Sequence, residues 1–209
     1  QAELHNIDVE AAGMADFGKP SGYVERQVRG WNQRMVNART DDVPGCDAVM
    51  AWLKQKMPPD PGRTAIIHND YKLDNVVLDA ADPTRLIGVL DWEMATLGDP
   101  VMDFGCFMSY WVQADDPQAL QQVRMGPTHL PGMLTRAQML ARYREKTGLA
   151  IDDWDFYQVF GLFRLIVIAQ QIYRRYKDGK TADARFKKFA LFVPVLGEAC
   201  ERIIERSQL

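Results

Sequence analysis

The stretch that decides the fold of this chain runs from residue 66 to residue 75 and reads Ile-Ile-His-Asn-Asp-Tyr-Lys-Leu-Asp-Asn. Sixteen residues after Asn75, Asp91 follows the apolar run 86–90. Apolar runs at 63–67, 75–78 and 86–90 predict three short strands. The pattern His-x-Asp-x-x-x-x-Asn therefore falls in a loop between two strands, with Asp91 at the end of a third.

A loop of this composition carries the groups that phosphoryl transfer requires. Transfer from ATP asks the protein mainly for positioning and for neutralisation of charge. Asp70 is placed to accept the proton of an attacking hydroxyl, and Lys72 can direct a positive charge at the transferred phosphate. His68 completes this predicted catalytic group, where it holds the loop by hydrogen bonds rather than moving protons.

Asn75 and Asp91 offer hard oxygen atoms, which Mg²⁺ prefers. The sequence thus predicts a magnesium site at these two residues, with Mg²⁺ and ATP as cofactors. Glu93 either reaches the metal or the substrate, or makes a structural hydrogen bond. A single Asp in a turn is usually structural, so the prediction depends on Asp70, Lys72, Asn75 and Asp91 occurring together.

Three segments resemble the aminoglycoside phosphotransferase family, which includes antibiotic, choline and other small-molecule kinases. They are residues 68–75, Ile87-Gly88-Val89-Leu90-Asp91-Trp92-Glu93 and Gly98-Asp99-Pro100-Val101-Met102-Asp103-Phe104-Gly105. The resemblance implies a fold similar to protein kinases, with Asp70 as catalytic base and Asn75 and Asp91 as metal ligands. Asp99 and Asp103 match the family's Gly-Asp-Pro-x-x-Asp segment. We expect Asp99 to cap a helix and Asp103 to hold the catalytic loop through backbone bonds.

The N-terminal segments further resemble the branch of this family associated with acyl-CoA dehydrogenases. They read Leu4-His5-Asn6-Ile7-Asp8 and Phe17-Gly18-Lys19-Pro20-Ser21-Gly22-Tyr23. This resemblance points to a hydroxyacyl-CoA as the acceptor. The charge pattern agrees, because a polycationic aminoglycoside requires an acidic pocket and the C-terminal third of the chain has no acidic run. A neutral or anionic small molecule with a hydroxyl group is the expected substrate.

The candidate substrate-binding residues are Glu93, Arg164 and Gln171. Arg164 and Gln171 interrupt the apolar stretch 160–172, and polar groups in such a place need partners or a cavity. A structural salt bridge is an equally good interpretation of Arg164.

Several parts of a complete kinase are missing from the sequence. It has no glycine-rich phosphate loop, no strand lysine paired with a helix glutamate, and no alternating strand pattern before residue 60. We therefore predict a kinase-like C-terminal lobe, mainly α with a small β region (α+β). Its N-terminal lobe, absent from this chain, is expected as a partner within the same polypeptide. Residues 1–209 form one predicted domain, with the catalytic loop and metal-binding strands at 63–105 and a helical part at 132–209.

Periodic apolar positions and capping residues predict helices in the rest of the chain. The expected helices are 23–36, 46–57, 100–111, 135–146, 154–176 and 182–206. Asp99 with Pro100 begins one of them and Thr135 with Gln138 begins another. Pro194 is expected to kink or break the last helix, and residues 115–131 are expected to form a loop.

Composition argues against several classes of protein. A net charge of −3 and a pI near 5.7 give no electrostatic basis for binding nucleic acid. No apolar run reaches the ~18–20 residues of a membrane span. Cys46, Cys106 and Cys200 lack metal spacing and favour a reducing cytoplasm, where we expect the protein to be located.

Two other functions remain open at this point. The chain could be a non-catalytic binding module that has lost its ATP clamp, although such a module has no need for all four polar residues of the motif. It could also be a metal-dependent phosphohydrolase, in which Asp70 activates water instead of an acceptor hydroxyl.

Overall fold

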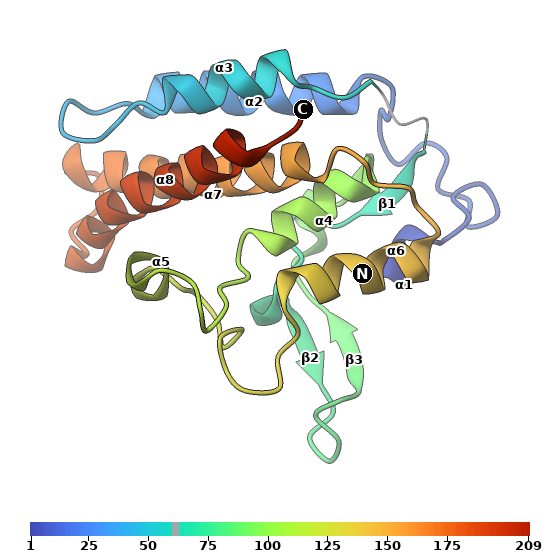
Figure 1. Ribbon diagram of the computed structural model, residues 1–209. Coiled ribbons are helices and arrows are strands. Elements are labelled where there is room, and N and C mark those ends of the chain that lie inside the picture. The colour runs from blue at the N-terminus through green and yellow to red at the C-terminus, as the bar shows by residue number, and fades with distance from the viewer. Residues whose placement is uncertain (60–62) are drawn as a thin grey trace.

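The computed structural model describes residues 1–59 and 63–209, and most of what it describes is helical (Figure 1). The α-helices are α1 (Ala2–His5), α2 (Tyr23–Ala38), α3 (Asp47–Gln55), α4 (Pro100–Met108), α5 (Gln118–Gln122), α6 (Arg136–Thr147), α7 (Trp154–Lys177) and α8 (Phe192–Arg206). Shorter 3-10 helices are η1 (Leu73–Asn75), η2 (Trp92–Met94) and η3 (Ala184–Leu191). The strands are β1 (Ala65–Ile67), β2 (Val76–Leu78), β3 (Leu86–Val89) and β4 (Thr96–Gly98). The predicted fold class, mainly α with a small β region, is confirmed.

The strands form two separate antiparallel pairs. β1 pairs with β4, with Ala65 opposite Gly98, and β2 pairs with β3, with Val76 opposite Val89. The sequence did not predict β4, because a three-residue strand that ends in glycine is too short to show the alternation of apolar and polar residues typical of a strand. The β2–β3 hairpin extends away from the helices at the bottom of Figure 1. The predicted catalytic loop therefore connects the two pairs.

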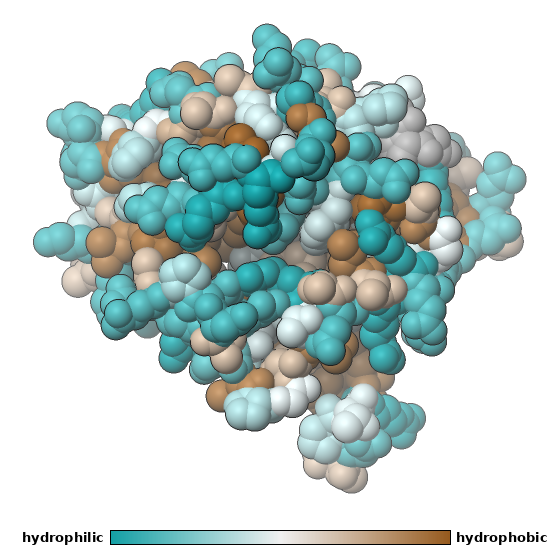
Figure 2. All heavy atoms as spheres, in the orientation of Figure 1, coloured by the Kyte–Doolittle hydropathy of each residue, from teal (hydrophilic) through white to brown (hydrophobic). Residues whose placement is uncertain are grey.

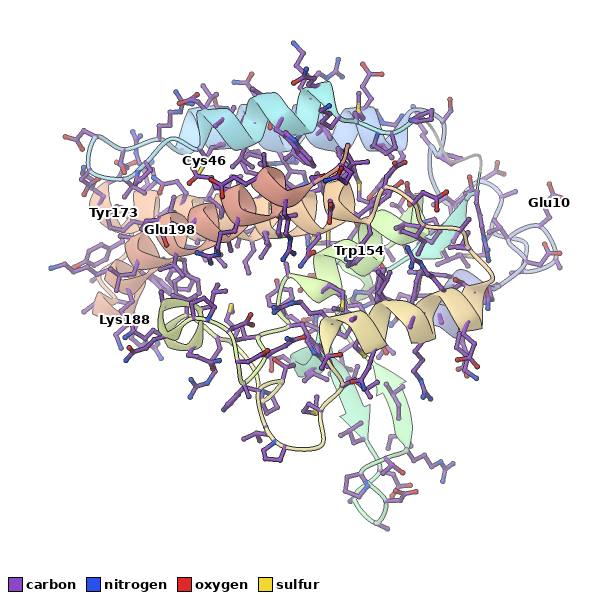
Figure 3. The ribbon with its side chains drawn as sticks, viewed as in Figure 1. Glu10, Cys46, Trp154, Tyr173, Lys188 and Glu198 are labelled. Carbon is purple, nitrogen blue, oxygen red and sulfur yellow. The ribbon has the colours of Figure 1, made fainter. Side chains whose placement is uncertain are left out.

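Helix α7 is the centre of the core. Its side chains Phe156, Phe163 and Ile166 are completely buried, and α2, α4 and α8 all pack against it. Trp154 at its beginning (labelled in Figure 3) lies against Phe104 of α4, with ring centroids 5.4 Å apart. By length and composition α7 could also cross a membrane, but 78% of its apolar window is buried inside the protein, as in the core helix of a globular domain.

Two helix starts follow the expected capping chemistry. The Asp99 carboxylate accepts the backbone N–H groups of Val101 (2.7 Å) and Met102 (3.1 Å), and Pro100 is the first residue of α4. Thr135 forms a capping box at the start of α6. These short-range signals could be predicted because each requires residues only two or three positions apart.

Three predicted boundaries were wrong. Helix α4 ends at Met108 rather than at residue 111, and the expected loop 115–131 contains the short helix α5. The predicted helix 182–206 is divided into η3 and α8, and the division lies at Phe192 rather than at Pro194. Pro194 sits in the first turn of α8, where its missing N–H leaves no helical hydrogen bond unmade.

The surface differs between the helical body and the hairpin. Hydrophilic side chains cover much of the face seen in Figure 2, with smaller hydrophobic groups between them. In the hairpin, Leu78, Leu86 and Ile87 are 47%, 45% and 55% exposed. Since neither face of this hairpin is covered, its pairing depends on cross-strand hydrogen bonds more than on burial.

Candidate active site

Helix α4 holds the loop that carries Asp70 through hydrogen bonds to the loop backbone. Asp103 lies one turn after the α4 cap, and its carboxylate accepts the backbone N–H groups of His68 (3.3 Å) and Asn69 (2.7 Å). The expectation that Asp103 holds the catalytic loop through backbone bonds is therefore confirmed. Because Asp99 fixes the start of the same helix, the loop takes its position from the α4 N-terminus.

His68 is completely buried and links two parts of the site. Its Nδ1 accepts the backbone N–H of Asp70 (3.2 Å), and its Nε2 lies 2.8 Å from the carbonyl oxygen of Leu90. These partners fit an imidazole that carries its proton on Nε2 and donates it to Leu90. The ring also packs against Trp92, with centroids 4.8 Å apart. His68 thus places the residue before Asp91 next to the catalytic loop, in the structural role expected for it.

Asp70, Lys72 and Asn75 come together at the open end of the loop. The Lys72 ammonium lies 2.7 Å from Asp70 Oδ2, and Asn75 Nδ2 donates to the same oxygen (3.1 Å) and to the Asp70 carbonyl (2.9 Å). The Asp70 and Lys72 side chains are 22% and 24% exposed, so a ligand can reach both. One carboxylate therefore has a cation and an amide in direct contact.

The two predicted metal ligands, Asn75 and Asp91, lie on neighbouring segments. The N–H of Leu90 donates to the Asn75 carbonyl (2.8 Å), and this bond places Asp91 one residue further along. Asn75 turns its Nδ2 toward Asp70, which leaves the amide oxygen for a cation. Asp91 is exposed. Among the described residues no group of three or more His, Cys, Asp or Glu could hold a metal. Two hard oxygens fit Mg²⁺, which keeps water and phosphate oxygens as its other ligands.

Two residues of the site have a left-handed backbone. Asn69 has φ 64° and Asp91 has φ 62°, a conformation uncommon for residues other than glycine. Asn69 is held by the Tyr23 hydroxyl, which donates to Oδ1 (2.9 Å), and by its own Nδ2, which donates to the Met94 carbonyl (2.9 Å). Sequence reasoning missed Asn69 and Tyr23. The available signal was an Asn, which tolerates this conformation, directly before the predicted base.

The candidate substrate residues are dispersed. Arg164 is buried on α7, and its guanidinium lies 5.2 Å from the ring centroid of Trp31. None of the ion pairs between described side chains includes Arg164, so the salt-bridge interpretation was wrong. Burial opposes its charge, but the surrounding Cys106, Tyr110 and Asp70 more than offset this and raise the Arg164 pKa.

Glu93 and Gln171 are both exposed. Glu93 lies in η2, two residues after the predicted metal ligand Asp91. Gln171 lies seven residues beyond Arg164 on α7, which is about 10 Å along the helix axis. The neighbouring Gln170 is buried and donates to the Ala38 carbonyl (2.9 Å). Glu93 thus stays close to Asp91 along the chain, whereas Gln171 lies on the exposed side of α7.

A cavity of about 310 Å³ lies between the end of α4 and helices α5, α7 and α8. Its apolar wall includes Met108, Trp111, Val112, Leu120, Val123, Leu162, Leu165, Leu196 and Ile203. Its polar lining includes the exposed side chains of Arg124, Arg202 and Arg206. Arg136 also lines it but is paired with Asp116, with Nη2 and Oδ1 2.5 Å apart.

This cavity reaches toward the catalytic loop. A smaller recess that contains Lys72 shares Tyr110, Trp111 and Met125 with it. The Tyr110 ring also faces Lys72, whose Nζ lies 5.8 Å from the ring centroid of Tyr110. Burial, and next the Asp70 carboxylate, raise the pKa of Tyr110 to about 12, so its hydroxyl stays protonated at neutral pH. The sequence could not indicate this cavity, because its walls come from four helices.

The chain has relatives among known proteins. It is 32% identical over 184 residues to mouse acyl-CoA dehydrogenase family member 10, and this match covers 87% of this chain and 17% of the mouse protein. It is 27% identical over 209 residues to human acyl-CoA dehydrogenase family member 11, covering 99% of this chain and 26% of that protein. The chain thus spans about a quarter or less of the length of these relatives.

A solved structure shares the fold. The crystal structure of a protein from Ralstonia eutropha JMP134, provisionally classed as an aminoglycoside phosphotransferase, is 33% identical and superposes with a TM-score of 0.84. The match covers 99% of this chain and 63% of that one. The model of the phosphotransferase enzyme family, APH, matches residues 1–143. With its kinase-like fold and with Asp70 and Asp103 placed as described, the chain belongs to the APH phosphotransferase enzyme family.

Proposed function

We propose that this protein transfers the γ-phosphoryl group of ATP to a hydroxyl group of a small molecule, in the presence of Mg²⁺. The observation that carries the proposal is the contact of Asp70 with Lys72 and Asn75, in a loop that His68 joins to the segment of Asp91. Neither a turn nor a helix cap needs a carboxylate, a cation and an amide in mutual contact.

Each side chain has a role that follows from its place. Asp70 accepts the proton of the acceptor hydroxyl as the oxygen attacks phosphorus. Lys72 balances the charge of Asp70 in the free protein and can turn to the transferred phosphate, since its flexible side chain is partly exposed. Asn75 and Asp91 would hold Mg²⁺, which neutralises negative charge on the phosphates when it is bound.

We further propose that groups outside these 209 residues complete the ATP site. The sequence contains no glycine-rich loop and no strand lysine, and the chain covers 63% of the solved relative. An N-terminal lobe of the same polypeptide is the proposed source of these phosphate contacts.

The cavity beside Tyr110 is the proposed acceptor site, and its chemistry favours a neutral or anionic molecule. Its lining includes Arg124 and Arg206, which take part in no ion pair between described side chains, together with Arg202, and its wall is apolar. A polycationic aminoglycoside is repelled by such a rim. A hydroxyacyl-CoA, with an apolar chain and anionic phosphates, fits it better, and the acyl-CoA dehydrogenase names of two relatives support the same substrate.

The test is phosphoryl transfer by the complete polypeptide that contains this chain. Hydroxyacyl-CoA thioesters, free hydroxy acids and an aminoglycoside are incubated with ATP and Mg²⁺, and phosphorylated products are detected by mass spectrometry. We expect a phosphorylated product from the hydroxyacyl-CoA thioesters, and a transfer rate at least about 100-fold lower in the Asp70→Asn variant. The Asp91→Asn variant should need a far higher Mg²⁺ concentration than the natural protein to reach half of its maximal transfer rate. Asp82→Asn, which removes an exposed carboxylate at the hairpin tip, is the matched control.

Other outcomes would replace the proposal. Phosphate release from ATP without any acceptor, abolished by Asp70→Asn, would indicate a phosphohydrolase. Normal transfer by the Asp70→Asn variant would remove Asp70 from the reaction. If the complete polypeptide does not bind ATP, the chain is a binding module.

A further inference from the structure

The Asp103 carboxylate is a buried junction between the catalytic loop and the N-terminal segment. Besides the two loop amides, its Oδ2 meets His5 Nε2 at 3.0 Å and accepts Gln1 Nε2 at 2.8 Å. The side chains of both Asp103 and His5 have no exposed surface. The N-terminal segment and the loop that carries the predicted base Asp70 therefore bind the same carboxylate, which lies almost a hundred positions from His5 in the sequence.

A buried carboxylate needs compensation for its charge. Burial alone raises the pKa of Asp103, but the hydrogen bond and the charge of His5, with the bonds from Gln1 and the Asn69 amide, hold the pKa below its ordinary value. Among the described residues, His5 is the basic side chain paired with Asp103. The charged state of the residue that holds the loop thus depends on His5.

His5 is itself held on its opposite side. Its Nδ1 lies 2.7 Å from the hydroxyl oxygen of Tyr143 in α6, and that hydroxyl can donate to the carbonyl of Pro100 (3.2 Å). The two rings also meet edge to face, with centroids 5.8 Å apart. The Asp103 carboxylate and the Tyr143 hydroxyl therefore hold the His5 ring from opposite sides.

We propose that His5 is a positioning residue, which orients Asp70 by keeping the Asp103 carboxylate turned toward the amides of His68 and Asn69. The effect on turnover rests on the proposed phosphotransferase function, whereas the effect on the loop does not. Helix α1 contributes His5 to the junction and its N-cap residue Gln1 also donates to Asp103, so docking of α1 against β1 and α6 is coupled to the geometry of the loop that carries Asp70.

Two substitutions separate the nitrogens of His5. In His5→Gln the side-chain amide reaches the Nε2 position and can still donate to Asp103. In His5→Asn the amide reaches only the Nδ1 position, so the contact with Tyr143 remains possible and the bond to Asp103 is lost. Both are polar and of similar size, so a difference between them reports the bond to Asp103 rather than cavity formation.

The readout is hydrogen exchange of the His68 and Asn69 amides in the complete polypeptide. We expect exchange at least about tenfold faster in His5→Asn, and close to the natural rate in His5→Gln, because both amides are bonded to Asp103. In the transfer assay, His5→Asn should lower kcat at least about tenfold while KM for ATP changes less than about twofold.

Asn6→Ala is the matched control. Asn6 is next to His5 and anchors the same helix end, since its Nδ2 donates to the Lys146 carbonyl (2.7 Å) and its Oδ1 accepts from Arg63 (2.8 Å). It does not contact Asp103, so its loss should leave exchange at the loop unchanged. If Asn6→Ala and His5→Asn accelerate exchange equally, the effect belongs to α1 docking and the proposal is wrong.

Unchanged exchange in a folded His5→Asn would also overturn it. Should His5→Asn not fold, Tyr143→Phe gives the second test, because it frees His5 on one side and should speed exchange of the same two amides. Absence of phosphoryl transfer in the natural protein, with the exchange pattern as expected, would count against the proposed function alone.

Discussion

Gly161→Ala should destabilise the protein strongly, although alanine favours helices. Helices α4 and α7 touch through their backbones at Gly105 and Gly161. A Cβ atom at position 161 would lie 2.1 Å from the Gly105 oxygen, 2.6 Å from its carbonyl carbon and 3.1 Å from the Cys106 nitrogen, where ordinary contacts are 3.4–4 Å. The neighbours are backbone atoms of a helix, so α4 and α7 must separate by more than about 1 Å.

The magnitude follows from two opposing effects. Replacing a helical glycine by alanine gains about 1 kcal/mol from helix propensity. Overpacking a well-filled core costs typically 1–3 kcal/mol and sometimes more, and the separation also loosens the packing of Phe104 and Phe160 around the crossing. Because the clash is with backbone atoms at 2.1 and 2.6 Å, we place the cost at about 3–4 kcal/mol, at the top of this range or above it. After the gain of about 1 kcal/mol, the free energy of unfolding should fall by about 2–3 kcal/mol, which lowers Tm by roughly 5–10 °C in a domain of this size.

Gly30→Ala in α2 is the matched control. Among the described atoms, the Cβ at position 30 meets the Nη1 atom of Arg34 alone, at 3.3 Å, and this is the end of a flexible side chain. The same substitution should therefore raise stability by up to about 1 kcal/mol. Urea denaturation followed by circular dichroism measures both variants. A Gly161→Ala variant as stable as the natural protein, or a loss in Gly30→Ala as large as in Gly161→Ala, would refute the reasoning.

Three further predictions concern stability. Thr135→Ala removes the capping box with Gln138 and should cost about 1 kcal/mol in urea denaturation, and an unchanged midpoint would contradict it. Because the pKa of Asp103 is lowered in the folded protein, its carboxylate contributes stability that is fully present above about pH 4 and is lost as pH falls through the folded pKa. Acid unfolding of Asp103→Asn should therefore depend less on pH than that of the natural protein. Equal pH dependence would count against this role. Arg164→Met should lower the free energy of unfolding by about 2 kcal/mol in thermal unfolding, because it removes a buried cation whose charge the surrounding groups favour and which lies 5.2 Å from the Trp31 ring centroid, and an unchanged Tm would contradict this role.

Much of the candidate site was readable from spacing because its chemistry is local. Asp70, Lys72 and Asn75 lie within six residues, and a loop of that length brings them together whatever surrounds it. The caps at Asp99 and Thr135 are local in the same sense, because each side chain bonds amides within the next three residues. Strand β4 and the break between η3 and α8 were missed, because packing rather than local pattern decides such short elements.

The sequence by itself determined the kinase-like fold class, the position of the candidate catalytic loop and two helix caps, since these depend on residue type and short spacing. Only the tertiary structure decided how that loop is held. The bond from His5 to Asp103 spans 98 positions and the bond from Tyr23 to Asn69 spans 46. The contact of Gly105 with Gly161 and the cavity beside Tyr110 likewise need several helices in place. Such contacts arise when separate apolar faces are buried together, and no local pattern records which polar groups that burial brings into contact.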